Sequence, residues 1–136
     1  VFTPHPGEAS RLLRTFKGKF TSTTIQENRI AALKELHQKW GGNFLLKGSG
    51  SLVCSTSGEI SLCPYGNPGM ASGGMGDVLS GLIGGLMAQG FDPTYALQLA
   101  VCLHAKAADI ASYECGERGL LAGDLIPIAR QLLNQH

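Results

Sequence analysis

Apolar residues recur along this chain with two different spacings. A spacing of three to four residues, typical of helices with one buried face, predicts helices over residues 6–13, 24–40, 74–89 and 93–114, and a last one that follows 122–124 and ends near 134. Shorter apolar runs without that period predict strands over 43–47, 51–55 and 59–63. Because the strands are interleaved with helices, the pattern indicates an α/β layered domain.

Polar residues and glycines mark the ends of these elements. Thr24 and Glu27 have the spacing of a capping box at the start of the 24–40 helix, and Gly41-Gly42 ends it. The inward face of this helix is expected to hold Ile30, Leu33, Leu36 or His37, and Trp40. Residues 17–23 are expected to form a loop.

The predicted sheet is small. Residues 51–55 and 59–63 are expected to form the two arms of a hairpin, and Val1–Thr3 the end of a further strand. The three consecutive helices after this hairpin need more sheet to cover than these strands supply. We therefore expect residues 1–136 to be part of a larger domain, with strands missing upstream.

Composition narrows the classes of function. The 136 residues are 43% apolar and 15% charged, which is typical of a globular domain, and a lightly charged surface favours a homo-oligomer. A net charge of +1 gives no basic surface for nucleic acid or for an anionic membrane. The longest apolar run, residues 78–88, is too short to span a bilayer. The four cysteines include no C-x-x-C pair, so reduced thiols in a cytoplasmic protein are expected.

Residues 67–81, with the sequence NPGMASGGMGDVLSG, carry the strongest chemical signal. Five glycines surround one acid, Asp77, and a helical pattern starts directly after it. A glycine-rich turn that leads into a helix points several N–H groups at one place, where the helix dipole also favours negative charge. We expect the amides from Gly74 through Asp77 to hold a phosphoryl group, and the Asp77 carboxylate to accept the proton of an attacking hydroxyl.

Other glycine-rich motifs do not fit this segment. Gly69 and Gly74 have the Walker A spacing, but Met75-Gly76 stands where that motif requires Lys and Ser or Thr. The chain has no strand–GxGxxG–helix unit and no Gly-x-Ser-x-Gly turn, which argues against a Rossmann dinucleotide site and against a nucleophile elbow. The alternative for Asp77 is structural, as an N-cap of the helix that follows.

A proline-rich turn follows the first predicted strand. Pro4, Pro6 and Gly7 stiffen this turn, which presents His5 and Glu8 at the sheet edge where ligands bind in open α/β folds. A neutral imidazole can hydrogen-bond a substrate, and a carboxylate can hold Mg²⁺ through water. The alternative gives His5 a contact within the turn and Glu8 a favourable place in the first helical turn.

A second glycine turn, KGSGS, follows the strand over 43–47. It consists of Lys47, Gly48, Ser49, Gly50 and Ser51. The Lys47 ammonium can meet phosphate oxygens and the open backbone can accept an adenosine, although such a turn is also an ordinary connection between strands. His104 and Lys106, on the alanine-rich helix, are expected to be a packing residue and a surface residue.

Three segments, TPHPGEASRLL, LLKGSGSLV and NPGMASGGMGDVLSGLIGGLMAQG, together resemble the ADP/ATP-dependent NAD(P)H-hydrate dehydratase family. The resemblance runs over nearly all 136 residues. It implies a three-layer, ribokinase-like α/β fold, of which residues 1–136 would be the C-terminal portion of a single domain. It also implies an epimerase domain, fused upstream or acting as a partner.

The resemblance implies a reaction in two steps. A hydroxyl on hydrated NADH or NADPH takes a phosphoryl group from ADP or ATP, and phosphate then leaves. By the same resemblance, Asp77 is the catalytic base, and the anion hole consists of Gly74, Met75 and Gly76. His5 and Asp77 contact the hydrate, and Glu8 stands near Mg²⁺ and its water. The nucleotide is lined by Lys47, Gly48, Ser49, Gly50, Ser51 and Gly76.

Two other functions remain open. A ribokinase-like kinase for a vitamin precursor shares the glycine-rich anion hole and the following acid, but its strand-end turn is not HPGE. The second is an inactive nucleotide-binding fragment, which would bind ADP and leave hydrated NADH unchanged.

Overall fold

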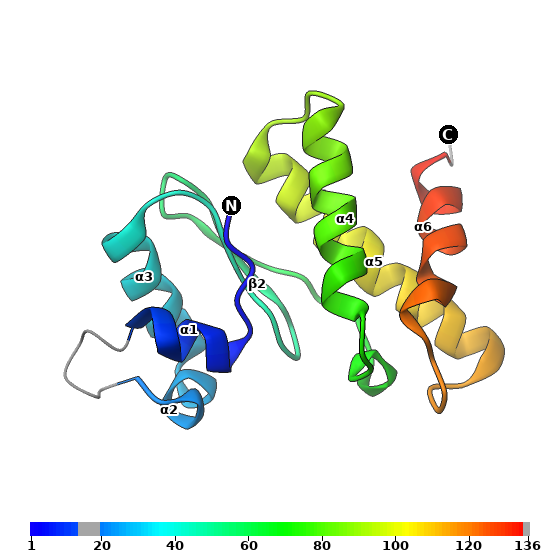
Figure 1. The fold of residues 1–136 in the computed structure, drawn as a ribbon, viewed down its shortest axis with the longest axis horizontal. Coiled ribbons are helices and arrows are strands. Elements are labelled where there is room, and N and C mark those ends of the chain that lie inside the picture. Colours follow the sequence, from blue (N-terminus) through cyan, green and yellow to red (C-terminus); the bar gives the residue numbers. More distant parts are fainter. Residues whose placement is uncertain (14–19, 135–136) are drawn as a thin grey trace. The chain divides into compact units, whose positions relative to one another are not determined.

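A computed structural model describes residues 1–13 and 20–134 as two compact units, Val1–Leu62 and Cys63–His136 (Figure 1). The chain contains both helices and a sheet, so the prediction of an α/β protein is confirmed. The two units are described separately below.

Residues 1–13 and 20–62 of the first unit form three helices and three strands. These are α1 (Pro6–Leu13), α2 (Ser22–Glu27), α3 (Arg29–Trp40), β1 (Phe44–Leu46), β2 (Leu52–Cys54) and β3 (Ile60–Leu62). The strands form an antiparallel sheet in the order β1-β2-β3, with Leu45 opposite Val53 and Val53 opposite Ser61. The predicted hairpin is therefore confirmed.

The segment before α1 extends this sheet. The Phe2 amide donates to the Asn43 carbonyl at 2.9 Å, and the Leu45 amide donates to the Phe2 carbonyl at 2.8 Å, which pairs Phe2 with Phe44 in parallel. Two parallel segments joined through helices form the connection typical of α/β proteins. Because the Lys47 amide also donates to the Pro4 carbonyl at 2.9 Å, the first turn and the KGSGS turn begin side by side.

Helices α1 and α3 pack together, and α3 packs on β1 and β2. All three side chains of β1 are buried, which explains its unbroken apolar sequence. The core of this unit consists of Ala9, Leu13, Ile25, Ala32, Leu33, Leu36, Phe44, Leu46, Leu52 and Cys54.

The single helix predicted over 24–40 is wrong, because Asn28 divides it into α2 and α3. The Asn28 side chain accepts a hydrogen bond from the Ala31 amide and caps α3, a role that asparagine fills better than a helix interior. The capping box predicted for Thr24 and Glu27 lies one turn earlier, between Thr21 and Thr24. The predicted loop over 17–23 is therefore wrong from Ser22 on, and residues 17–19 lie outside the described part of the chain.

The predicted inward face of α3 is confirmed only in its middle. Leu33 and Leu36 are fully buried, whereas Ile30 and Trp40, at the two ends of the helix, are 51% and 50% exposed. The small residue Ala32 completes the buried face instead.

The second unit is helical. It contains η1 (Pro68–Met70), α4 (Met75–Ala88), α5 (Pro93–Cys115), η2 (Ala122–Asp124) and α6 (Leu125–Leu133). Helix α5 packs against both α4 and α6 (Figure 1). Alanines at Ala107, Ala108 and Ala111 let these helices approach closely around Met75 and Leu125.

Two further observations on the described residues concern the thiols and the helices. All four cysteines are free thiols, with Cys54 and Cys63 buried and Cys115 exposed. Within residues 1–13 and 20–134, every helix is either too short or too polar to cross a membrane.

Candidate functional site

His5 and Glu8 form a reciprocal cap at the start of α1. The amides of Gly7 and Glu8 donate to His5 Nδ1 at 3.1 and 3.2 Å, and the His5 amide donates to Glu8 Oε2 at 2.7 Å. This is the geometry of a capping box, with an imidazole in place of the usual hydroxyl. Because Nδ1 accepts hydrogen bonds, the neutral ring carries its proton on Nε2, which is therefore a donor. This geometry fits a structural role for the turn as the cap of α1, and it also fits a role in binding a ligand.

Glu8 also faces the second turn of this unit. Its Oε2 lies 3.6 Å from Lys47 Nζ, and its Oε1 lies 3.5 Å from His5 Nε2. The hydrogen bond from the His5 amide, assisted by the charge of Lys47, lowers the pKa of the Glu8 carboxyl below its usual value. The structure therefore brings His5, an ionised Glu8 and Lys47 together.

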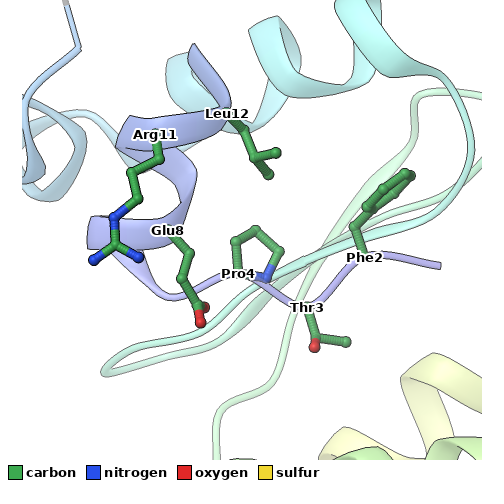
Figure 2. A pocket seen from close by; sticks show the side chains of 6 residues that line it. All are labelled: Phe2, Thr3, Pro4, Glu8, Arg11 and Leu12. Carbon is green, nitrogen blue, oxygen red and sulfur yellow. The ribbon is translucent and has the colours of Figure 1, made fainter. Parts of the chain in front are cut away.

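A hollow of about 370 Å³ opens beside this group. It is lined by Phe2, Thr3, Pro4, Glu8, Arg11 and Leu12. Figure 2 shows the Glu8 carboxylate extending from α1 toward the segment that carries Thr3 and Pro4. The charged carboxylate of Glu8 therefore lines a space large enough for part of a small ligand.

The KGSGS turn connects β1 to β2, and an arginine that the sequence analysis missed lies against it. The Arg29 guanidinium donates to the carbonyls of Leu46, Ser49 and Gly50, and Ser51 Oγ donates to the Gly48 carbonyl at 3.3 Å. No motif in the sequence indicates this contact, because 17 to 21 positions separate Arg29 from its acceptors.

The glycine-rich segment of the second unit begins α4. Gly74 is the N-cap in the left-handed region, with φ of 85°, and no side chain caps this helix. Its carbonyl accepts from the amides of Asp77 and Val78, both at 3.0 Å. The expectation that the Asp77 amide helps to hold an anion is therefore wrong. The amides of Gly74, Met75 and Gly76 precede Asp77, the first residue whose amide donates within the helix, and they remain as the candidate anion hole.

Asp77 occupies the third position of α4, so the alternative that its side chain is the N-cap is also wrong. The residue is exposed, and within the described part of the chain its carboxylate makes no hydrogen bond or ion pair. A carboxylate in the same helical turn as open amides can accept a proton from a hydroxyl held between them.

Asp109 of α5 and two side chains of the loop itself hold the loop that precedes α4. Asp109 accepts from the Gly66 amide at 3.1 Å and from Asn67 Nδ2 at 3.0 Å, and Asn67 Oδ1 accepts from the Gly69 amide at 3.0 Å. Ser72 Oγ donates to the Leu120 carbonyl at 3.0 Å. These residues position the loop. In the sequence, only the Asn-Pro pair at the start of η1 indicated that a turn begins here.

His104 packs under the first residue of α4, which confirms its expected packing role. Its side chain is 4% exposed, and the backbone of Met75 partly offsets the effect of burial on its pKa. Burial lowers the pKa of the imidazole below its ordinary value, so the ring is neutral at neutral pH. Its Nε2 is buried without a hydrogen-bond partner among the described residues.

The predicted site residues fall into two sets. His5, Glu8 and the KGSGS turn lie in the first unit, and Gly74, Met75, Gly76 and Asp77 lie in the second. Among the described residues, no group of three or more His, Cys, Asp or Glu side chains could bind a metal ion directly.

Comparison with known proteins identifies the family. The family model described as NAD(P)H-hydrate dehydratase matches residues 1–131. The bifunctional NAD(P)H-hydrate repair enzyme Nnr of Coxiella burnetii is 50% identical over 134 residues, which cover 98% of this chain and 26% of the relative. The ADP-dependent (S)-NAD(P)H-hydrate dehydratase of Neisseria meningitidis serogroup B is 42% identical over 136 residues, which cover 99% of this chain and 44% of that protein.

Solved structures show the same relationship. The ADP/ATP-dependent NAD(P)H-hydrate dehydratase of Bacillus subtilis, co-crystallised with ATP and Mg²⁺, superposes with a TM-score of 0.87 at 32% identity, covering 98% of this chain and 47% of that one. A ribokinase-like superfamily protein of Enterococcus faecalis gives a TM-score of 0.76 at 30% identity, covering 97% of this chain and 43% of that one. The ribokinase-like fold expected from the sequence is confirmed. The chain spans from about a quarter to less than half of the length of the curated relatives described above. On the strength of a family match that runs through both compact units, this chain belongs to the NAD(P)H-hydrate dehydratase family.

Proposed function

We propose that this chain is the C-terminal portion of a single ribokinase-like domain that dehydrates hydrated NADH or NADPH with ADP or ATP as the phosphoryl donor. The observation that carries the proposal is the exposed Asp77 carboxylate, in the same first helical turn as the open amides of Gly74, Met75 and Gly76. The names of the relatives, one of which is ADP-dependent, agree with this chemistry.

In the first step, the hydroxyl oxygen on the nicotinamide ring attacks the terminal phosphorus of the nucleotide. Asp77 accepts the hydroxyl proton, a new O–P bond forms, and the bond to the bridging oxygen of the nucleotide breaks. The amides of the anion hole stabilise the charge that builds on the phosphoryl oxygens. Because phosphate is a much better leaving group than hydroxide, its departure and the loss of a ring proton restore the reduced ring.

The turns of the first unit bind the two substrates in this proposal. His5 donates from Nε2 to the hydrate, since its Nδ1 is held by the cap of α1. Lys47, Gly48, Ser49, Gly50 and Ser51 line the nucleotide, together with Gly76. The ammonium of Lys47 supplies positive charge for a phosphate, although it also contacts Glu8.

The donor set at Glu8 fits Mg²⁺ held through water. Mg²⁺ usually keeps several waters and binds one or two carboxylates together with substrate phosphates. Glu8 offers a single carboxylate whose lowered pKa keeps it ionised, with Oε2 3.6 Å from Lys47 Nζ and Oε1 3.5 Å from His5 Nε2. When bound, the ion would neutralise phosphate charge and so favour attack on phosphorus.

The wider setting completes the proposal. An epimerase domain fused upstream, or an epimerase partner, agrees with the word bifunctional in the names of several relatives. A cytoplasmic location agrees with four free thiols, and a homo-oligomer agrees with a chain of 15% charged residues.

The experiment follows the return of reduced-nicotinamide absorbance when the full-length protein is incubated with hydrated NADH, Mg²⁺ and ADP or ATP. Asp77→Asn keeps the size of the side chain and removes the base, so kcat should fall about 10²- to 10⁴-fold while ADP binding is retained. Glu114→Gln, which neutralises another acid of the second unit, is the control and should leave kcat unchanged.

Near-normal turnover by Asp77→Asn would show that another group accepts the proton. A wild-type protein that binds ADP and leaves hydrated NADH unchanged would contradict the dehydratase function itself.

A further inference from the structure

The position of Arg29 is electrostatically unfavourable, and its contacts with the KGSGS turn offset part of that cost. It is the first residue of α3, where the helix dipole disfavours a positive charge. Burial lowers the pKa of its guanidinium, and its Nε is buried with no hydrogen-bond partner in the described part of the chain. Both features reduce stability unless another interaction offsets them.

The guanidinium binds backbone carbonyls of the turn and of the strand end before it. Nη2 donates to the Leu46 carbonyl at 2.9 Å, and Nη1 donates to the Gly50 carbonyl at 2.9 Å and to the Ser49 carbonyl. Neither ion pair of Glu8 includes Arg29, and no carboxylate among residues 1–13 and 20–134 pairs with its guanidinium. Its full positive charge therefore remains beneath the turn.

These hydrogen bonds also decide which way the turn amides point. In a trans peptide, the C=O and N–H groups lie on opposite sides, so a carbonyl directed at Arg29 directs the next N–H away from it. The amides that follow the Ser49 and Gly50 carbonyls belong to Gly50 and Ser51. Gly50 has φ of 64°, and successive amides around such a left-handed residue can form a small anion-binding concavity.

The fit between Arg29 and the turn is close. A Cβ added at Gly48 would lie 3.1 Å from Nη2 of Arg29 and 3.2 Å from its Cζ. The glycine at this position therefore leaves the space that the guanidinium occupies. Lysine, with one compact ammonium group, cannot satisfy three carbonyls in the same arrangement.

We propose that Arg29 is a positioning residue for the adenine nucleotide: it fixes the KGSGS turn so that the Gly50 and Ser51 amides face the nucleotide, and it places a positive charge behind them. This inference rests on the proposed nucleotide-binding role of the turn. It assigns Arg29 no contact with the hydrate and none with the proton that Asp77 accepts.

The test compares Arg29→Lys and Arg29→Met with wild type in the full-length protein. ADP binding is measured by titration calorimetry, and KM for nucleotide, KM for hydrated NADH and kcat are measured by the absorbance assay. Arg118→Met, which removes an exposed arginine of the second unit, is the matched control.

Arg29→Lys should weaken ADP binding and raise the nucleotide KM about tenfold, and Arg29→Met more, because charged hydrogen bonds are lost in both. KM for the hydrate and kcat should stay within about twofold of wild type, since Arg29 acts only through the turn.

Three results would overturn the inference, and they can be told apart. Unchanged ADP binding in both variants would remove the role of Arg29 and leave the proposed function standing. An equal loss of affinity for both substrates, with a lower unfolding temperature, would make Arg29 a general stabilising residue. A wild-type protein that binds no adenine nucleotide would contradict the proposed function as well.

Discussion

The position of Asp77 within its helix decides what its carboxylate can do. An aspartate at the N-cap binds the first amides of the helix and so closes them to a ligand. Here Gly74 takes the N-cap position with a left-handed backbone, and Asp77 lies three residues later with its side chain exposed. The amides and the acid are thereby both available, which is the arrangement that phosphoryl transfer with a general base requires.

His104 should make stability depend on pH. Its folded pKa lies below the unfolded value of about 6.5, so the unfolded state binds a proton first as pH falls. The contribution of this residue is fully present above about pH 6.5 and decreases as pH falls from there toward the folded pKa. The free energy of unfolding, measured by denaturant titration at several pH values, should therefore decrease over that range.

His104→Gln isolates this effect. The difference in unfolding free energy between wild type and the variant cancels the other titrating groups, and it should become smaller as pH falls below about 6.5. A difference that does not change with pH would show that the ring is protonated equally in both states.

At the scale of elements, the conformation of the loop before α4 depends on a tightly enclosed glycine, Gly69. A Cβ added at Gly69 would lie 2.8 Å from the Glu117 carbonyl oxygen and 2.9 Å from Asn67 Oδ1. Gly69→Ala must displace backbone or break the hydrogen bonds of Asn67, so it should lower the free energy of unfolding by about 1–3 kcal/mol. Thermal or denaturant unfolding measures this change.

Gly81→Ala is the matched control within α4. A Cβ at Gly81 meets nothing within 4 Å, and the residue lies in the helix interior. Alanine should therefore stabilise this helix by about 0.5–1 kcal/mol. If both alanines had the same effect, the close approach at Gly69 would not explain its loss of stability.

The division between α2 and α3 shows how one polar residue changes an element. The apolar spacing continues through Asn28, but its side chain caps α3 through the Ala31 amide. The break makes Arg29 the first residue of a helix, and from there its side chain reaches the KGSGS turn. An uninterrupted helix, as the spacing predicted, would give no reason to expect that contact.

At the scale of the whole molecule, each unit has a hydrophobic core of its own. Leu36 in the first and Leu125 in the second are both fully buried. Leu36→Ala and Leu125→Ala should each lower the free energy of unfolding by about 2–5 kcal/mol, because each leaves a cavity. Denaturant unfolding followed by circular dichroism measures both changes.

The controls are two exposed leucines, Leu62 in the first unit and Leu121 in the second, which are 60% and 63% exposed. Alanine at either position should change stability by no more than about 0.5 kcal/mol. A large loss at Leu62 or Leu121 would indicate that these side chains are buried in the folded protein.

The sequence alone predicted the α/β class, the order of most elements, the family and the candidate anion hole. It could do so because these depend on neighbours in the chain: an apolar period, a glycine run before a helix, and a short motif such as HPGE. The roles of Asp77, His5 and the KGSGS turn follow from that resemblance and remain proposals.

Tertiary structure decided what depends on residues far apart in the chain. Three such features are the contact of Arg29 with the KGSGS turn, the hydrogen bonds of Asp109 to the loop before α4, and the burial of His104 near Met75. No local sequence pattern predicts any of them. A hydrogen bond between residues 17 to 43 positions apart in the sequence depends on how the chain folds back on itself. The spacing of side chains along one helix cannot predict such a bond. The sequence thus determined which residues could do the chemistry, and the fold decided which others hold them in place.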